Sequence, residues 1–116
     1  MRSPHDVFES HLELAETFDI ESDLDLNVAD DVVVLTGFGV FEGHDGVRIL
    51  GDLLRAQLPN ARFRYTTKVV RGEVAFLEWT AEADGATVRD GADSFVIRNG
   101  RIVAQTIHYT VEPVSR

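Results

Sequence analysis

Apolar residues recur at helical spacing near the start of the chain. Val7, His11, Leu14 and Phe18 are separated by four, three and four positions, so they fall on one face of a helix. Ser3 followed by Pro4 is a typical helix start, because a capping side chain precedes a proline at the first helical position. The pattern predicts an amphipathic helix over roughly residues 4–18, with His11 and Phe18 pointing inward.

Two further helices are predicted before residue 60. A weaker one runs from Asp19 to about Ala29, and its apolar face holds Ile20, Leu24 and Val28. Another opens at His44-Asp45 and ends at Pro59. Its buried face consists of Val47, Leu50, Leu54 and Leu58.

The remaining pattern is that of strands. A short strand is expected at 32–36 and resumes at 40–41, after a Gly-Phe-Gly break. After Pro59 the apolar period changes to two, which predicts strands at 63–69, at 74–83, from the Asp84-Gly85 turn to about Arg98, and at 101–112. Helices followed by long antiparallel strands indicate an α+β fold, with three N-terminal helices packed on a curved, mainly antiparallel sheet. We expect one domain over residues 1–116.

The net charge belongs to the N-terminal segment. Residues 1–31 hold ten acids against one base, giving −9, whereas residues 32–116 hold ten of each. A nucleic-acid binder would need a basic surface, so this class is excluded. The acids are interpreted as a solvated helical face, and a docking surface for a basic partner is the alternative.

Composition excludes further classes. The chain has no cysteine, so disulfides, thiolate catalysis and cysteine-ligated metals are ruled out. Its four histidines lack metal-ligand spacing, and no nucleotide-binding motif occurs, so we expect neither a metal nor a cofactor. No apolar run is long enough to span a bilayer, and no signal peptide is recognisable. A cytoplasmic location is the expectation.

Three segments together resemble the SnoaL-like branch of the nuclear transport factor 2-like (NTF2-like) superfamily. They are the acidic helix leading through residues 29–32 into the first strand, the segment Phe41–Arg48, and Gly91-Ala92-Asp93-Ser94-Phe95 followed by Asn99-Gly100-Arg101-Ile102. The resemblance implies a cone-shaped α+β fold around a small-molecule pocket. It does not determine the activity, because this scaffold carries isomerases, cyclases, hydrolases and non-catalytic binders.

The Asn99-Gly100 turn predicts the register of the last two strands. If it is a two-residue hairpin turn, Phe95 lies opposite Ala104 and Asp93 opposite Thr106. Phe95 and Thr106 then share a largely apolar face with Asp93, and His108 lies diagonal to Asp93. Such an Asp–His pair is either an acid/base unit or a buried hydrogen bond that fixes the hairpin.

The resemblance implies an acid/base or hydrogen-bonding role for Asp93, because an acid at this place faces the pocket in related cyclases and isomerases. The helix-borne tyrosine of ketosteroid isomerases falls near Ser10-His11, so only His11 could replace it. The general base of those isomerases has no counterpart, because residues 32–41 contain no acid. His11 is therefore either a ligand-facing residue or a satisfied core histidine.

Aromatic residues complete the candidate site. Phe18, Tyr65 and Trp79 are candidate ligand contacts, beside Phe95 and Thr106. A turn at Arg71-Gly72 would place Tyr65 opposite Glu78, as a pocket pair or as a satisfied structural pair. Trp79 is either a ligand platform or part of the core or of a dimer surface.

Two functions remain open at this point. The first is an enzyme that moves a proton on a small, mostly apolar ligand, with Asp93 assisted by His108 or His11. The second is a non-catalytic pocket or dimerisation domain. In either case we expect a homodimer, because the opposite sheet face, with Val96, Val103, Ile107, Tyr109 and Val111, is too apolar to stay in water.

Overall fold

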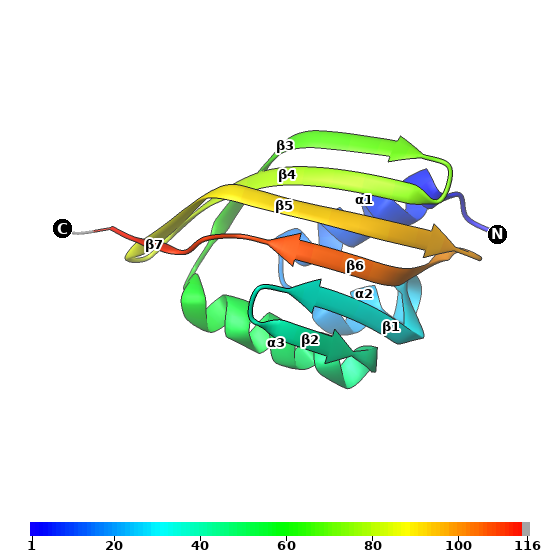
Figure 1. The fold of residues 1–116 in the computed structure, drawn as a ribbon, viewed down its shortest axis with the longest axis horizontal. Coiled ribbons are helices and arrows are strands. Elements are labelled where there is room, and N and C mark those ends of the chain that lie inside the picture. Colours follow the sequence, from blue (N-terminus) through cyan, green and yellow to red (C-terminus); the bar gives the residue numbers. More distant parts are fainter. Residues whose placement is uncertain (115–116) are drawn as a thin grey trace.

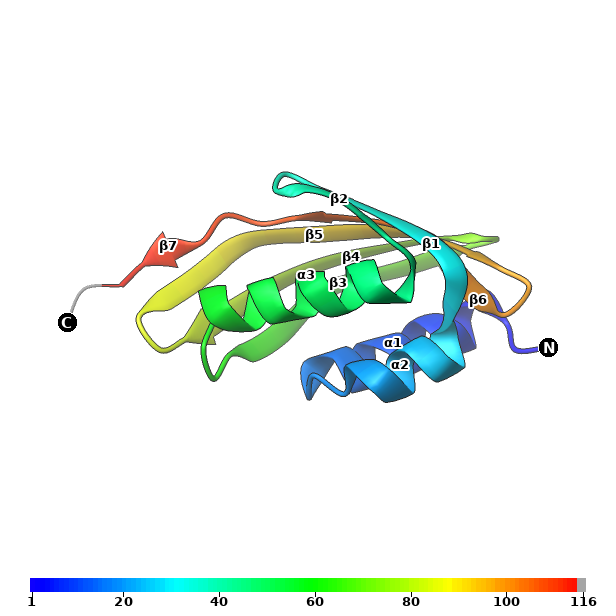
Figure 2. The same cartoon turned by 90° about the horizontal axis from the view of Figure 1, so that it is seen from below.

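The computed structural model describes residues 1–114 and shows three helices on one face of a curved sheet (Figures 1 and 2). The helices are α1 (Pro4–Glu16), α2 (Ile20–Asn27) and α3 (Gly43–Gln57). The strands are β1 (Val28–Thr36), β2 (Gly39–Glu42), β3 (Arg62–Arg71), β4 (Val74–Ala83), β5 (Ala86–Arg98), β6 (Arg101–His108) and the short β7 (Glu112–Pro113). The expected α+β architecture is confirmed.

The helices begin as their sequences predict. The Ser3 hydroxyl accepts a hydrogen bond from the Asp6 backbone N–H at 3.1 Å, which caps α1 just before Pro4. The Asp19 carboxylate caps α2 in the same way, accepting from the Ser22 N–H. Both helices end two residues earlier than expected, and α2 also begins one residue later. The third helix starts at Gly43, one residue before the expected position.

The sheet is mixed and open. Its strands follow the order β2-β1-β6-β5-β4-β3, and β7 pairs with β5. Within residues 1–114, the pairing of β1 with β6 is parallel and the other pairings are antiparallel. The core lies between the sheet and the helices, and its largest fully buried side chains include Phe8, Phe95, Leu24 and Leu58.

The β5–β6 hairpin has the expected turn but not the expected register. Asn99 and Gly100 have φ of 54° and 75°, as a two-residue turn of this type requires. Beyond Ile97–Ile102 the register shifts by one residue, so Phe95 lies opposite Gln105 and Ser94 opposite Thr106. The shift is a bulge at Val103, which reverses the faces predicted for the rest of β6.

A second bulge changes the β3–β4 hairpin. Its turn is formed by Gly72 and Glu73, and Tyr65 lies opposite Trp79 rather than opposite Glu78. The register shifts between Tyr65 and Thr67. Val69, which follows Phe63 and Tyr65 at even spacing and so falls on their face in a regular strand, is therefore exposed.

Candidate functional site

Two adjoining cavities lie between the sheet and the helices. Their volumes are about 70 and 130 Å³, and both are lined by His11, Ala15, Leu54, Asp93 and Ile107. Apolar side chains from α1, α3 and the sheet make up most of the walls. A cavity of roughly 150 Å³ with apolar walls holds one benzene-sized ring. The larger cavity therefore suits a single small ring.

Asp93 is the carboxyl group that lines both cavities. It projects from β5 between apolar neighbours and is only 7% exposed. Its Oδ1 accepts a hydrogen bond from Trp79 Nε1 at 2.9 Å, and its Oδ2 accepts from Gln105 Nε2 at 3.3 Å. Burial raises the pKa of Asp93 to about 6, although Trp79, the charge of His11 and Gln105 each act to lower it. Asp93 can thus gain or lose a proton near neutral pH.

The position of Trp79 depends on a glycine. The indole lies against Gly91, where an added Cβ would come within 2.3 Å of the ring. This close approach is possible only without a side chain at residue 91. Because Gly91 precedes Asp93 by two residues on the same strand face, it lets Trp79 Nε1 reach the Asp93 carboxylate. This packing explains why a glycine stands two residues before Asp93 in the segment Gly91-Ala92-Asp93.

His11 is the second ionisable group of the cavity. Its ring packs edge-on against Phe95, and its Nδ1–H donates to Asp23 Oδ2 at 2.7 Å. Burial alone would lower the pKa of His11, but the charge and hydrogen bond of Asp23, with the charge of Asp93, raise it above the usual value. The imidazole is therefore held toward its protonated form.

The other ring nitrogen of His11 opens onto the cavity. Nε2 has no hydrogen-bond partner within residues 1–114. In the same residues, every fully buried side-chain nitrogen or oxygen has a partner, so Nε2 is not sealed inside the protein. Since His11 lines both cavities, Nε2 is available to a bound molecule.

The structure keeps most of the predicted site residues together. Tyr65 and Trp79 line the smaller cavity, and Phe18 lines the larger one. The Tyr65 hydroxyl donates to the Leu12 carbonyl at 3.0 Å, and burial raises the pKa of this phenol. Phe95 is fully buried and supports His11 from behind rather than lining either cavity.

Two predicted residues lie elsewhere, because the bulge at Val103 turns them to the opposite face. Thr106 is exposed on the outer side of β6. The His108 side chain is 70% exposed, and its Nε2 lies 3.4 Å from Asp90. The predicted Asp93–His108 pair is therefore wrong, and the histidine beside Asp93 in the cavity is His11.

Sequence reasoning missed Asp23, Asn27 and Gln105. Asp23 was counted among the solvated acids, yet it is buried beside His11. Asp23 and Asn27 follow Ile20 by three and seven positions, which is the spacing of a buried helix face. That spacing could have indicated that Asp23 and Asn27 are buried. Gln105 could not be assigned correctly because the assumed register placed it on the outer face.

A larger recess lies outside the cavities. Its volume is about 450 Å³, and Glu16, Phe18, Arg55 and Asn60 are among the residues that line it. Phe18 also lines the larger cavity, so this residue borders both spaces. The recess lacks a pair of buried ionisable groups. We therefore place the candidate chemistry in the two smaller cavities around Asp93.

The sequence profile of the SnoaL-like domain matches residues 8–105, which is most of the chain. The chain belongs to the SnoaL-like family. The matched span includes most of α1, with His11, and all of β5, with Asp93. No curated protein shows significant sequence similarity to the chain.

Solved structures share the fold of this SnoaL-like domain. An NTF2-like protein of unknown function from Burkholderia pseudomallei has a TM-score of 0.79 at 20% identity, over 95% of this chain and 92% of that protein. A candidate ketosteroid isomerase from Kribbella flavida has a TM-score of 0.78 at 12% identity, over 97% and 81%. TerC, crystallised with polyporic acid, has a TM-score of 0.77 at 19% identity, over 92% and 91%. These similarities establish an NTF2-like cone.

Two further observations concern the chemistry available to this domain. Within the described residues, no group of three or more His, Asp or Glu side chains is placed to hold a metal ion. Among the same residues, no helix combines the length and hydropathy that crossing a membrane requires.

Proposed function

We propose that the cavity binds a small, mostly apolar ring molecule with a carbonyl oxygen, and that Asp93 moves a proton on it with the help of His11. One observation carries this proposal. Two buried ionisable groups with raised pKa values, one on a helix and one on a strand, open onto the same apolar cavity. Such pairs are typical of acid/base sites.

The proposed reaction uses the two groups in different roles. The Asp93 carboxylate removes a proton from the carbon next to the ligand carbonyl, so the C–H bond breaks and its electrons form a carbon–carbon double bond. The carbonyl π electrons move onto the oxygen, which accepts a hydrogen bond from the protonated Nε2 of His11. Asp93 then returns the proton to the same carbon or, where the ligand has a second double bond conjugated with the new one, to the far carbon of that double bond as the electrons shift along the system.

Related folds support this class of ligand. One of the similar structures is a candidate ketosteroid isomerase, and another was crystallised with polyporic acid. The cavity here is smaller than a multi-ring ligand needs, so a single ring fits the structure as it stands. A larger ligand would require lining side chains to move, and Phe18 is the candidate because it borders both the cavity and the outer recess.

Non-catalytic binding is the second candidate function. Both Asp93 oxygens already accept hydrogen bonds, and the neighbouring carboxylate, Asp23, is occupied by His11 and Asn27. A network in which every carboxylate oxygen is already bonded could orient a ligand without reacting with it. In that case the protein would bind the ring ketone but would not exchange its protons.

Cyclohexanone is a suitable probe, because it combines one apolar ring with one carbonyl. We expect saturation-transfer NMR to detect its binding to the wild-type protein, and binding to weaken in Asp93→Asn and His11→Gln. His108→Gln is the matched control and should bind as the wild type does, because His108 lies on the outer face. Equal binding to all four proteins would contradict the assigned site.

A further inference from the structure

A chain of hydrogen bonds leads from His11 to the protein surface. Asp23 Oδ2 accepts from His11 Nδ1–H at 2.7 Å, and Asp23 Oδ1 accepts from Asn27 Nδ2 at 2.9 Å. The Asn27 amide also donates to Ser10 Oγ at 3.0 Å, and its Oδ1 accepts from Arg2 Nη1 at 2.7 Å. Asn27 is fully buried, whereas Arg2 is exposed. These hydrogen bonds therefore connect the cavity to Arg2, at the N-terminal end of the protein.

This arrangement fixes the Asp23 carboxylate in one orientation. One oxygen is held by Asn27, so the other stays directed at His11 Nδ1. Burying a carboxylate is costly, and apolar residues of similar size are often at least as stabilising in such a place. A buried, fully partnered Asp–Asn pair beside a cavity histidine thus points to a role in controlling that histidine rather than to stability alone.

We propose that Asp23 is a positioning residue: it binds His11 Nδ1–H and so presents Nε2–H to the ligand oxygen as a charged donor. Asn27, which is itself bonded to Arg2, holds Asp23 in place. The ligand-facing part of this inference rests on the proposed function. The role of Asp23 also restricts the class of ligand that the cavity would bind. A charged donor in an apolar cavity favours an oxygen that becomes negative, such as that of an enolising ring ketone.

The groups around His11 determine its charge. Asp23 approaches it from α2 and Asp93 acts on it from β5. Tyr65 on β3 also lines the cavity, but its hydroxyl donates to Leu12 and burial keeps it neutral. Gln105 on β6 is uncharged and is bound to Asp93, and α3 contributes apolar side chains. Asp23 is thus the carboxylate in direct contact with the imidazole, and its removal should lower the pKa of His11.

NMR titration of the four histidines tests this inference without reference to any ligand. In the wild type we expect His11 to titrate above the usual histidine pKa. In Asp23→Asn, burial is opposed only by Asp93, so His11 should titrate below the usual value while the other three histidines remain unchanged. Asp25→Asn is the matched control, because Asp25 is exposed on the same helix.

The outcomes separate the two proposals. An unchanged His11 titration in Asp23→Asn, or a wild-type His11 that is already neutral at pH 6, would overturn the role of Asp23. The wild-type measurement stands even if the variant does not fold. If His11 shifts as expected but cyclohexanone affinity is the same in Asp23→Asn as in the wild type, the link to ligand binding is overturned. If cyclohexanone fails to bind the wild type, the proposed function fails while the titration still decides the role of Asp23.

Discussion

At Asp93, burial and hydrogen bonding act on the same carboxyl group in opposite directions. Burial raises its pKa, whereas Trp79, His11 and Gln105 stabilise the charged form. The balance leaves a pKa of about 6, above the 3.8 of an ordinary aspartate. The folded protein therefore binds a proton at Asp93 more tightly than the unfolded chain does, and this difference makes stability depend on pH.

Asp93→Asn should remove that dependence. Between pH 4 and pH 6 the folded wild type holds the Asp93 proton while the unfolded chain releases it, so the contribution of Asp93 to stability falls as pH rises. Between pH 4 and pH 7, we expect the free energy of unfolding of the wild type to fall by about 2–3 kcal/mol relative to that of Asp93→Asn. Denaturant titrations of both proteins at four pH values measure this difference. Parallel stability curves would show that Asp93 is not desolvated.

The candidate site could be predicted only in part from the sequence. Asp93 was identified because its strand alternates clearly and its motif resembles a known family. His11 was identified by its helical spacing. Asp23 was not, because an acid within a strongly acidic segment looks like surface, and only its partner on α1 explains its burial. Pairings between two elements are decided by tertiary packing, which one sequence does not specify.

At the scale of elements, the types were predictable and the registers were not. Periodicity located the three helices and the long strands, and the Asn99-Gly100 turn was correct. The bulges near Thr66 and at Val103 leave no distinct residue pattern, yet each shifts a strand by one residue and reverses its later faces. The bulge at Val103 is the reason why His108 and Thr106 do not lie in the site.

The junction between α1 and α2 contains an unusual backbone conformation. Phe18 has a φ of 56°, a left-handed value that an L residue adopts only at a cost. Its ring packs on Phe63 at a centroid distance of 5.6 Å, and the Arg55 guanidinium lies 5.2 Å from its centre. These contacts explain why a large side chain occupies a position that usually takes glycine.

The strain at Phe18 predicts that glycine is more stabilising than alanine at this position, the reverse of the usual order. Phe18→Gly should be more stable than Phe18→Ala by about 1 kcal/mol, because both lose the ring contacts but only glycine adopts a positive φ freely. At Thr17, where φ is −101°, the alanine variant should be the more stable one. Thermal unfolding of the four variants gives both comparisons. If Phe18→Ala is more stable than Phe18→Gly, the backbone at residue 18 is not strained.

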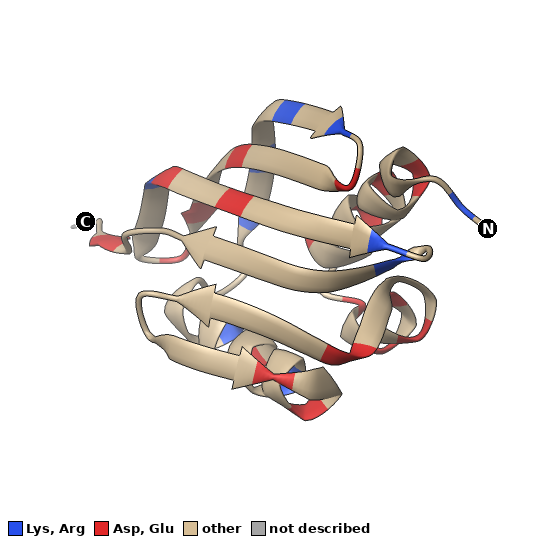
Figure 3. Cartoon of the chain, turned by 45° about the vertical axis from the view of Figure 1, so that its right-hand side comes forward, with Lys and Arg blue, Asp and Glu red and all other residues tan. Residues whose placement is uncertain are grey.

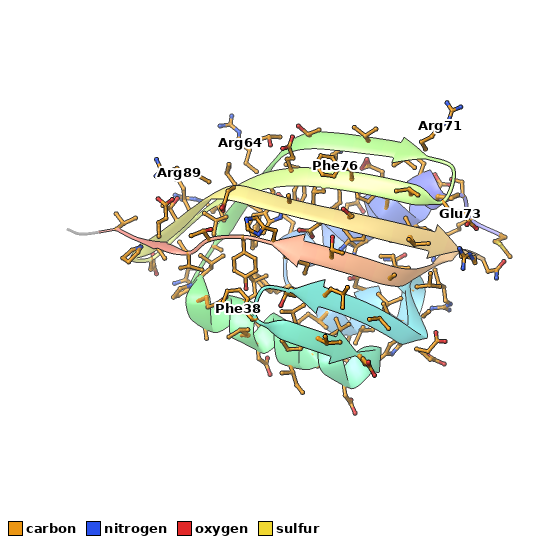
Figure 4. All side chains as sticks on the ribbon, in the orientation of Figure 1. Phe38, Arg64, Arg71, Glu73, Phe76 and Arg89 are labelled. Atoms are coloured by element: carbon orange, nitrogen blue, oxygen red, sulfur yellow. The ribbon has the colours of Figure 1, made fainter. Side chains whose placement is uncertain are left out.

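At the scale of the whole molecule, the helices cover one face of the sheet and leave the other uncovered (Figure 2). Acidic residues gather on α1 and α2, whereas β6 and most of β1 carry little charge (Figure 3). The outer face of the sheet holds exposed apolar side chains, among them Leu35 at 48% and Phe76 at 38%, and Figure 4 locates Phe76 on β4. An apolar outer face was expected, but Ile107 and Tyr109, once assigned to it, lie on the inner side.

We predict that this outer face pairs with a second copy of the chain. Leu35→Lys adds a charge to the apolar patch that Leu35 forms with Val33, Val74, Val96 and Ala104, and should convert a dimer into a monomer. Ile49→Lys is the control, because Ile49 is also an exposed apolar residue, at 60%, but lies on α3. Light scattering measures the mass of each protein. A wild type with the mass of one chain at micromolar concentration would contradict the prediction.

The most direct test of the proposed chemistry is deuterium exchange into cyclohexanone. Proton NMR in D₂O near pH 7 follows the loss of the protons next to the carbonyl. We predict that the wild-type protein accelerates this loss over buffer, and that Asp93→Asn reduces the acceleration by at least about 100-fold, the usual contribution of a positioned base. Exchange at the same rate in wild type, Asp93→Asn and buffer would contradict the assignment of Asp93 as the group that moves the proton.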